Sequence, residues 1–415
     1  MLIIKDRAIG EATSLPFEVV ERKGIGHPDS MADLVAEEFS LRYSLSGLER
    51  FGAVPNHWVD KVALIGAAAN VTFGGYKIAK PISAYLFGKV TPSVGDEALP
   101  IADLFESTVR DVLAIATGDE SIAANVRCLV ENTSGVAMDH PRGFYRPSTA
   151  GDYNVAISER RANDTSFCTA YAPATVTERL AIALENFVND AAFRDTFPLV
   201  GSDVKVMVTR VGDHADVTMC LPFHPERTPT FEQYRSTLAQ AETAVRDFAE
   251  QQIRAWAWDG TVSLALNTKD RNGGAYLAPF GTSLGKGDCG LVGRGNKSNG
   301  VIPAVRCTGV EAMAGKNPMH HTGKLYTLAA MRIADRVNAE LGLSNETVLL
   351  SRNGHLLSHP AFVGVRLAAG STSSEQKAIG DIVDDVLSNL DLLSKWLLTT
   401  SVINRFRRPA LNVEG

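Results

Sequence analysis

Residues 281–300 constrain the fold of this chain more than any other segment. They read GTSLGKGDCGLVGRGNKSNG, in which seven glycines are interleaved with Lys286, Asp288, Arg294 and Lys297. Glycine at every second to fifth position is incompatible with a regular helix or strand, so a long loop is predicted. Its backbone N–H groups and cations would suit a polyphosphate, and Asp288 adds an oxygen ligand for a metal ion. The alternative is a surface loop that binds nothing.

A second motif, GIGHPD at residues 24–29, directly precedes a predicted helix over 28–44. Glycines allow the backbone to approach a ligand closely, and Pro28 suits the first turn of a helix. The N-terminus of a helix offers free N–H groups to a phosphate. His27 could donate to a phosphate or bridging oxygen and Asp29 could bind Mg²⁺. The plainer interpretation is a capped helix with a surface His and Asp.

A third motif, EAMAGKNP at residues 311–318, leads to two adjacent histidines and to Lys324. Lys316 follows a glycine, where a lysine reaches a phosphate without crowding. His320 and His321 are poor joint ligands for one metal ion, and are interpreted as packing or hydrogen-bonding residues.

The polar cluster ANDTS at residues 162–166 contains Asn163 and Asp164. Such residues commonly cap helices and form turns, so alone the cluster is a weak functional signal.

The remaining pattern alternates between strands and helices. Strand, strand, helix units recur about three times, which favours an α+β protein over a doubly wound sheet. Helices are predicted over 28–44, 101–116, 177–190, 230–254, 321–341 and 373–398, and strands over 62–73, 204–211, 215–223 and 261–268.

The glycine-rich segment also contains GKGDCG (285–290), which matches the dinucleotide-binding pattern GxGxxG. That pattern requires a helix directly after it, and LVGRGNKSNG cannot form one. A dinucleotide-dependent oxidoreductase is therefore the weakest hypothesis.

Composition excludes several classes of protein. A chain of 415 residues suggests two or three domains. The net charge of -6 argues against nucleic-acid binding, which needs an excess of Lys and Arg. The five cysteines are odd in number and form no CxxC pair, so a reducing cytosol is expected. The N-terminal residues lack the apolar core of a signal peptide, and the longest apolar stretch, 62–71, is too short to cross a membrane.

In this order, ERKGIGHPDS, FGG after a VDK segment, ANDTS, the GTS…VGRGN loop and EAMAGKNP resemble the archaeal-type methionine adenosyltransferases. The resemblance covers roughly residues 16–367. It implies three similar α/β domains around a pseudo-threefold axis and a homodimer with active sites between the subunits. It also implies that the methionine sulfur attacks C5′ of ATP and displaces the triphosphate, which is hydrolysed to pyrophosphate and phosphate. Mg²⁺ is required, and some relatives use K⁺.

The resemblance also assigns roles to individual residues. His27 would stabilise the leaving oxygen, Arg294 and Lys316 would hold phosphates, and Asp29 and Asp288 would bind Mg²⁺. The other residues expected at ATP or its phosphates are Lys23, Gly26, Lys61, Asp164, Gly287, Gly293, Lys297 and Lys324. The amino-acid substrate is expected near Asn163, Asp164 and Ala68.

Three segments depart from the family pattern: Cys289 in GDCG, the stretch 67–72 before FGG, and residues 131–153. Adenosyl transfer is therefore better supported than methionine as the acceptor. The alternative is a related adenosyl or nucleosidyl transferase that uses another acceptor in a specialised pathway. A non-catalytic regulatory subunit is disfavoured because the phosphate-binding residues are all present.

The expected domains are 1–125 with GIGHPD, 126–228 with ANDTS, 229–370 with the glycine-rich loop, and a tail at 371–415. These boundaries are approximate because the domains are expected to interleave.

Overall fold

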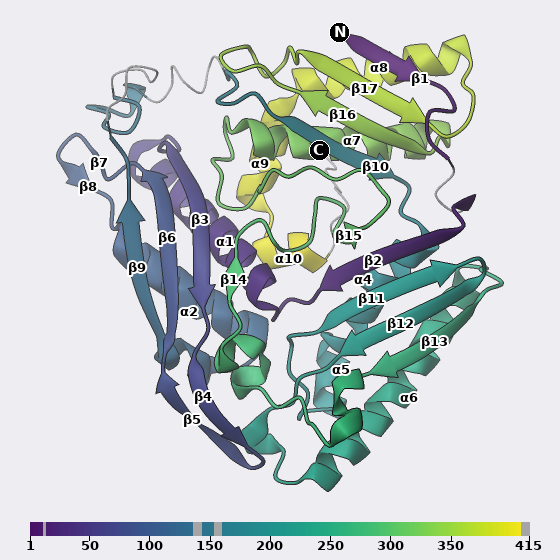
Figure 1. Cartoon of the computed structure of the whole chain (residues 1–415). Helices are drawn as coiled ribbons and strands as arrows, with labels where there is room; N and C mark the ends of the chain where they lie inside the picture. Colours follow the sequence, from purple (N-terminus) through teal and green to yellow (C-terminus); the bar gives the residue numbers. More distant parts are fainter. Residues whose placement is uncertain (11–13, 136–142, 153–159, 408–415) are drawn as a thin grey trace.

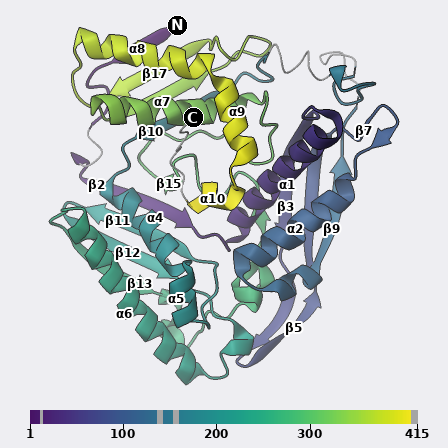
Figure 2. The same ribbon diagram turned by 180° about the vertical axis from the view of Figure 1, so that it is seen from behind.

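The computed structural model describes residues 1–10, 14–135, 143–152 and 160–407. Within these residues the main strands form three sheets of four, five and four strands, and helices pack on one face of each sheet. The three helical layers lie on the same side of the molecule, behind the sheets in Figure 1 and in front of them in Figure 2. The α+β architecture with three similar units is therefore confirmed.

The first unit combines the sheet β14–β3–β6–β9 with two helices. Helix α1 begins with proline in its first turn and ends before Gly52, whose φ of 67° is the left-handed conformation favoured by glycine. The elements are β14 (Gly290–Leu291), β3 (His57–Ile65), β6 (Ile82–Val90), β9 (Val126–Asn132), α1 (Pro28–Phe51) and α2 (Ile101–Thr117).

The second unit is built on the sheet β13–β12–β11–β2–β15. Its central hairpin is the predicted one, with Val211 opposite His214 across a tight turn. The first helix behind it begins with a reciprocal capping box between Thr175 and Glu178. The elements are β2 (Phe17–Lys23), β11 (Lys205–Val211), β12 (His214–Cys220), β13 (Thr261–Leu266), β15 (Ile302–Pro303), α4 (Val176–Val188), α5 (Ala191–Thr196) and α6 (Phe231–Ala255).

The third unit joins the N-terminal strand to the C-terminal part of the chain. Its sheet has the order β1–β17–β16–β10, in which Leu2 pairs with Val363 in parallel. The elements are β1 (Leu2–Lys5), β10 (Phe167–Ala172), β16 (Asn345–Leu350), β17 (Phe362–Leu367), α7 (Thr322–Leu341), α8 (Ser373–Ser388) and α9 (Leu390–Thr399).

Short elements lie between the main strands and helices, and α10 lies where the three units meet (Figures 1 and 2). They are β4 (Ala68–Thr72), β5 (Gly75–Lys80), β7 (Ser93–Val94), β8 (Glu97–Ala98), η2 (Glu120–Asn125), η3 (Pro225–Arg227), η4 (Thr268–Asn272), η5 (Pro279–Gly281), η6 (Ser283–Lys286) and α10 (Val402–Arg407).

Two sequence predictions were wrong in detail. The strand over 62–73 is two strands, β3 and β4, because the pairing is interrupted at residues 66–67, where Gly66 packs against the backbone of Asp288 and Ala67 N–H donates to the Leu284 carbonyl. The helix over 373–398 is two helices, because the Asn389 side chain binds the Asp385 carbonyl at 2.9 Å and ends α8. The other predicted helices are confirmed, and residues 281–300 are mostly irregular, as predicted. The expected domain boundaries remain predictions.

None of the helices in the described part of the chain combines the length and apolar character that a bilayer crossing requires.

Each unit has its own hydrophobic core between its sheet and its helices. In the first unit, the ring of Phe105 on α2 meets that of Phe39 on α1 edge to face, with centroids 6.0 Å apart. Both residues are fully buried, so they join α1, which carries the GIGHPD motif, to α2.

We therefore expect Phe105→Ala to lower the free energy of unfolding by about 3–5 kcal/mol, the cost of removing a buried phenyl ring. Ile115→Ala on the same helix is the control: its side chain is 59% exposed, so a change within about 0.5 kcal/mol is expected. Urea denaturation followed by circular dichroism measures both. Similar losses for the two variants would contradict the proposed core.

Candidate functional site

The GIGHPD motif forms the tight turn between β2 and α1. Gly24 N–H donates to the Val204 carbonyl at 2.6 Å, and Gly26 N–H donates to that of Ser202 at 3.2 Å. A Cβ atom at Gly26 would lie 2.0 Å from Ser202 Oγ, so only glycine fits. The turn is thereby fixed against the segment that leads into β11.

His27 is the N-cap residue of α1. Its Nδ1 accepts a hydrogen bond from Asp29 N–H at 3.1 Å, so the neutral ring carries its proton on Nε2. Burial lowers the pKa of His27 below its ordinary value; Lys23 acts in the same direction, whereas Asp203 and Asp29 oppose it. His27 is therefore a neutral imidazole at pH 7 with an Nε2–H donor.

Asp29 is held by both of its oxygens. Lys23 Nζ lies 2.9 Å from Oδ2, and Leu291 N–H donates to Oδ1 at 3.0 Å. Burial raises the pKa of Asp29, but the bonds from Lys23 and Leu291 outweigh it and leave the pKa below its ordinary value. Lys23 Nζ also donates to the Arg294 carbonyl at 2.6 Å, so Lys23 ties the turn to the glycine-rich loop, and its predicted role at a phosphate stays a prediction.

The glycine-rich loop passes directly over this turn. A Cβ atom at Gly290 would lie 2.0 Å from the Pro28 carbonyl oxygen. Behind the loop, Asp33 on α1 accepts N–H bonds from Gly293 at 2.7 Å and from Gly295 at 3.2 Å. The Gly293 N–H is therefore engaged within the protein.

Four other predicted residues of this part of the chain differ in how accessible they are to a ligand. Asp288 and Arg294 are exposed, and no other described residue forms a hydrogen bond or ion pair with their side chains. Gly287 is also exposed, in the left-handed region with a φ of 110°. Lys297 turns inward and donates to the Gly293 carbonyl at 3.1 Å.

Ala68 lies beside the same loop. Ala67 N–H donates to the Leu284 carbonyl at 2.8 Å, and a Cβ atom at Gly66 would lie 2.3 Å from the Asp288 carbonyl oxygen. The exposed Ala68 at the start of β4 is therefore a neighbour of Gly287 and Asp288.

Sequence reasoning missed Asp203, which is almost fully buried between the turn and the loop. It accepts hydrogen bonds from Ser283 N–H at 2.8 Å, from the Ser283 hydroxyl, and from the Tyr276 hydroxyl at 3.4 Å. Burial raises the pKa of Asp203, His27 lowers it, and Asp288 raises it, so these groups share one electrostatic environment. Its only sequence signal is a polar GSD directly before a buried strand.

A cavity of about 910 Å³ opens next to Asp288, over β11, β12 and residues 267–288. Three lysines line it, of which Lys205 and Lys269 were not predicted as ligands. The third, Lys286, lies 4.4 Å above the Tyr276 ring and donates to the Leu277 carbonyl at 2.9 Å. The cationic lining and the carboxylate of Asp288 make this cavity suitable for a metal-bound polyphosphate.

A second group of predicted residues lies elsewhere. Lys316 is buried, and its Nζ donates to the carbonyls of Val59 at 2.6 Å and Asp60 at 2.9 Å. Burial lowers the pKa of Lys316 to about 8. The exposed Lys61 pairs with Asp60 at 2.8 Å.

Three more predicted residues belong to this second group. Asn163 exchanges hydrogen bonds with Thr322 at 2.8 and 3.1 Å, so it fixes the start of α7. Asp164 is exposed, and its carboxylate accepts the N–H of Thr165 at 2.7 Å. Lys324 is buried and its Nζ pairs with Glu37 at 2.7 Å, and its role at a phosphate stays a prediction.

The two groups are well separated within one chain. Ser40 Oγ donates to the Lys316 carbonyl at 3.2 Å. Ser40 follows Asp29 by eleven residues on α1, which is about 16 Å along the helix axis. The structure thus brings His27, Asp29, Asp288, Arg294 and Ala68 together, and it places Lys316, Lys61 and Asp164 elsewhere.

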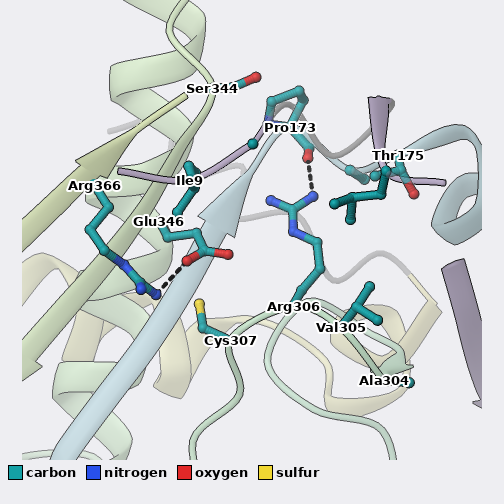
Figure 3. A pocket seen from close by; sticks show the side chains of 13 residues that line it. Ile9, Pro173, Thr175, Ala304, Val305, Arg306, Cys307, Ser344, Glu346 and Arg366 are labelled. Atoms are coloured by element: carbon teal, nitrogen blue, oxygen red, sulfur yellow. Dashed lines mark hydrogen bonds and ion pairs between the residues drawn. The ribbon is translucent and has the colours of Figure 1, made fainter. Parts of the chain in front are cut away.

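Two other features do not belong to this site. A cavity of about 470 Å³ between the second and third units is lined by none of the predicted residues, and its Arg366 pairs with Glu346 (Figure 3). Separately, Asp119, His224 and Glu226 form a possible metal cluster. Binding through Nδ1 would leave the proton on Nε2, which is buried and has no partner in the described part of the chain, so His224 is a poor metal ligand.

Comparison with known proteins identifies the family. The family profile described as S-adenosylmethionine synthetase (AdoMet synthetase) matches residues 2–401. The S-adenosylmethionine synthase of Caldivirga maquilingensis is 35% identical, over 92% of this chain and 94% of the relative. That of Sulfurisphaera tokodaii is 32% identical, over 94% of this chain and 96% of the relative.

A solved structure of similar fold is described as an unusual S-adenosylmethionine synthetase from Campylobacter jejuni. It aligns with a TM-score of 0.57 at 16% identity, over 92% of this chain and 88% of that one. The sequence matches confirm the family that the motifs indicated, and the chain belongs to the S-adenosylmethionine synthetase family.

Proposed function

We propose that this protein is an ATP:L-methionine S-adenosyltransferase that forms S-adenosylmethionine and releases pyrophosphate and phosphate. The observation that carries the proposal is the neutral His27 in a chain of this family. Its Nε2–H forms no hydrogen bond with a described residue, and His27 interacts electrostatically with Lys205 of the cationic cavity. The cytoplasmic location and the use of K⁺ remain predictions.

In the first step, the methionine sulfur forms a bond to C5′ of ATP while the bond from C5′ to the triphosphate oxygen breaks. The electron pair of the breaking bond stays on that oxygen, which becomes negatively charged. The His27 Nε2–H can donate to it, and this hydrogen bond strengthens as the charge grows. No base is required, because a thioether has no proton to lose.

The lysines of the cavity would hold the triphosphate, with Arg294 at the edge of the loop. Mg²⁺, when bound, neutralises charge on the triphosphate oxygens and prefers oxygen ligands. Asp288 fits this ion directly, because its carboxylate is exposed and unpaired among the described residues. Asp29 fits only by sharing oxygens that Lys23 and Leu291 already engage.

A homodimer would unite the two separated groups. The faces of the sheets opposite the helices are turned to one side (Figure 1). On the first sheet this side carries the stacked rings of Tyr85 and Phe87, and Ile65 and Leu291 at the strand ends are 38% and 37% exposed. A second copy packed here in twofold symmetry could place its Lys316 opposite the His27 of the first.

His27→Ala is expected to lower kcat by roughly two to three orders of magnitude, the usual loss of one donor to a developing oxyanion. The KM for ATP should change little, because the interaction grows mainly in the transition state. Steady-state kinetics with phosphate and S-adenosylmethionine detection measure both values. His214→Ala, on the exposed hairpin, is the control, and normal turnover of His27→Ala would refute the assignment.

Asp288→Asn is expected to raise the Mg²⁺ concentration for half-maximal activity by about tenfold or more, since an amide lacks the charge that holds the ion. Asp213→Asn, in a solvent-exposed turn, serves as the matched control. Activity is measured during Mg²⁺ titration at fixed ATP. An unchanged Mg²⁺ dependence would exclude Asp288 as a ligand.

Mixing two inactive variants tests whether the site is shared. Homodimers of His27→Ala and of Lys316→Ala should both be nearly inactive. After subunit exchange, about a quarter of wild-type activity should return, because half of the dimers are mixed and each has one intact site. Activity and dimer composition are followed by kinetics and native mass spectrometry. If mixed dimers form without activity, the two residues do not complement across an interface.

A further inference from the structure

A small cavity lies at the centre of the molecule, where the three units meet α10. It has a volume of about 160 Å³ and adjoins a second cavity of about 140 Å³ behind the glycine-rich loop. Figures 1 and 2 show α10 at this junction. The cavity is distinct from the candidate active site, because neither His27 nor Asp288 lines it.

Arg405 on α10 lines the cavity and is incompletely bonded. Its Nη1 donates to Glu37 Oε1 at 2.7 Å, and its guanidinium lies over the Trp396 ring at 5.5 Å. Nε and Nη2 are buried, and neither has a hydrogen-bond partner among the residues that the structure describes. These two nitrogens form one edge of the planar guanidinium, the two-donor fork that matches a carboxylate. A buried fork without a partner indicates a missing acceptor.

The charges around this fork also leave room for an anion. Glu37 is a single carboxylate, and it is shared by Arg405 and by Lys324, whose Nζ lies 2.7 and 3.0 Å from its two oxygens. The nearby Arg22 is already bonded to Glu185 at 2.9 Å. Arg405 and Lys324 thus carry two positive charges against the single charge of Glu37. Lys297 and Asp33, whose pKa burial raises to about 7, also line the cavity.

The remaining residues of the cavity lining favour a ligand with an apolar group next to its charge. It is largely apolar, with Leu34, Leu328, Met331, Trp396 and Val402 on its walls. A cavity of about 150 Å³ with such walls accommodates one benzene ring. Inorganic phosphate has no apolar part to fill this space.

We propose that the central cavity is a binding site for a small monocarboxylate with an apolar body the size of one aromatic ring, held by the Nε and Nη2 edge of Arg405.

The occupant would be coupled to the glycine-rich loop. Asp33 lines both cavities and accepts the N–H groups of Gly293 and Gly295, on either side of Arg294. A ligand that fills the cavity would restrict Asp33 and with it the loop. The site therefore provides a route by which a metabolite carboxylate changes the mobility of the loop.

Benzoate is the probe, titrated calorimetrically into the full-length protein. One molecule per chain should bind with a Kd of about 1 mM or tighter, the range for ring-sized ligands. Benzamide, which keeps the ring but not the charge, should bind about 10- to 100-fold more weakly. Inorganic phosphate should not compete. Hydrogen exchange of residues 290–300 should slow when benzoate is bound.

Three variants decide the assignment. Arg405→Lys keeps a cation beside Glu37 but lacks the two-donor edge, so benzoate binding should fall about 10- to 100-fold while the protein stays folded. Arg405→Met removes the charge as well as the two-donor edge. Arg407→Met, on the exposed side of α10, is the control and should bind benzoate as the wild type does. The proposal fails if Arg405→Lys binds benzoate as the wild type does, if the wild type does not bind it, or if phosphate displaces it.

Discussion

The backbone contact between the glycine-rich loop and the first turn of α1 positions the rest of the site. Gly290 lies against the Pro28 carbonyl so closely that a Cβ atom would be 2.0 Å from the oxygen. Next to this contact, Leu291 N–H donates to Asp29, which also pairs with Lys23. The orientation of His27 at the N-cap, the pairing of β14 with β3 and the position of the exposed loop all depend on this approach.

The sequence correctly indicated that residues 281–300 are a loop, but not how its glycines are used. A glycine-rich composition indicates that the backbone comes close to another group, but not whether that group is a ligand or another part of the protein. In the structure, Gly285, Gly290 and Gly295 lie against other parts of the protein, where a Cβ atom would clash. At Gly287, by contrast, no atom comes closer than 4.0 Å to such a Cβ position. Most of these glycines therefore allow the loop to pack against the rest of the protein, and a smaller part of the loop is open to a ligand.

Burial explains most of the remaining differences at the site. The family resemblance placed Lys324 at a phosphate, but the sequence pattern does not reveal that α1 supplies Glu37 to it. A buried ammonium is stable only when paired, so its partner decides its role. Asp203 was missed for the same reason: its importance comes from Ser283, eighty positions away.

The two carboxylates that are expected to bind a metal ion differ in how strongly other protein groups already engage them. Asp29 has a lowered pKa and an ammonium 2.9 Å from Oδ2, so a cation that binds there must compete with Lys23 for the same charge. Asp288 forms no hydrogen bond or ion pair with a described residue, although Lys286 acts on it electrostatically, and it lines an open cavity that also contains three lysines. The physical consequence is that the Asp29 carboxylate is engaged in the turn that orients His27, whereas the Asp288 carboxylate is the one that we propose as the metal ligand. A carboxylate thus stabilises the fold at position 29, whereas a carboxylate at position 288 remains available for binding.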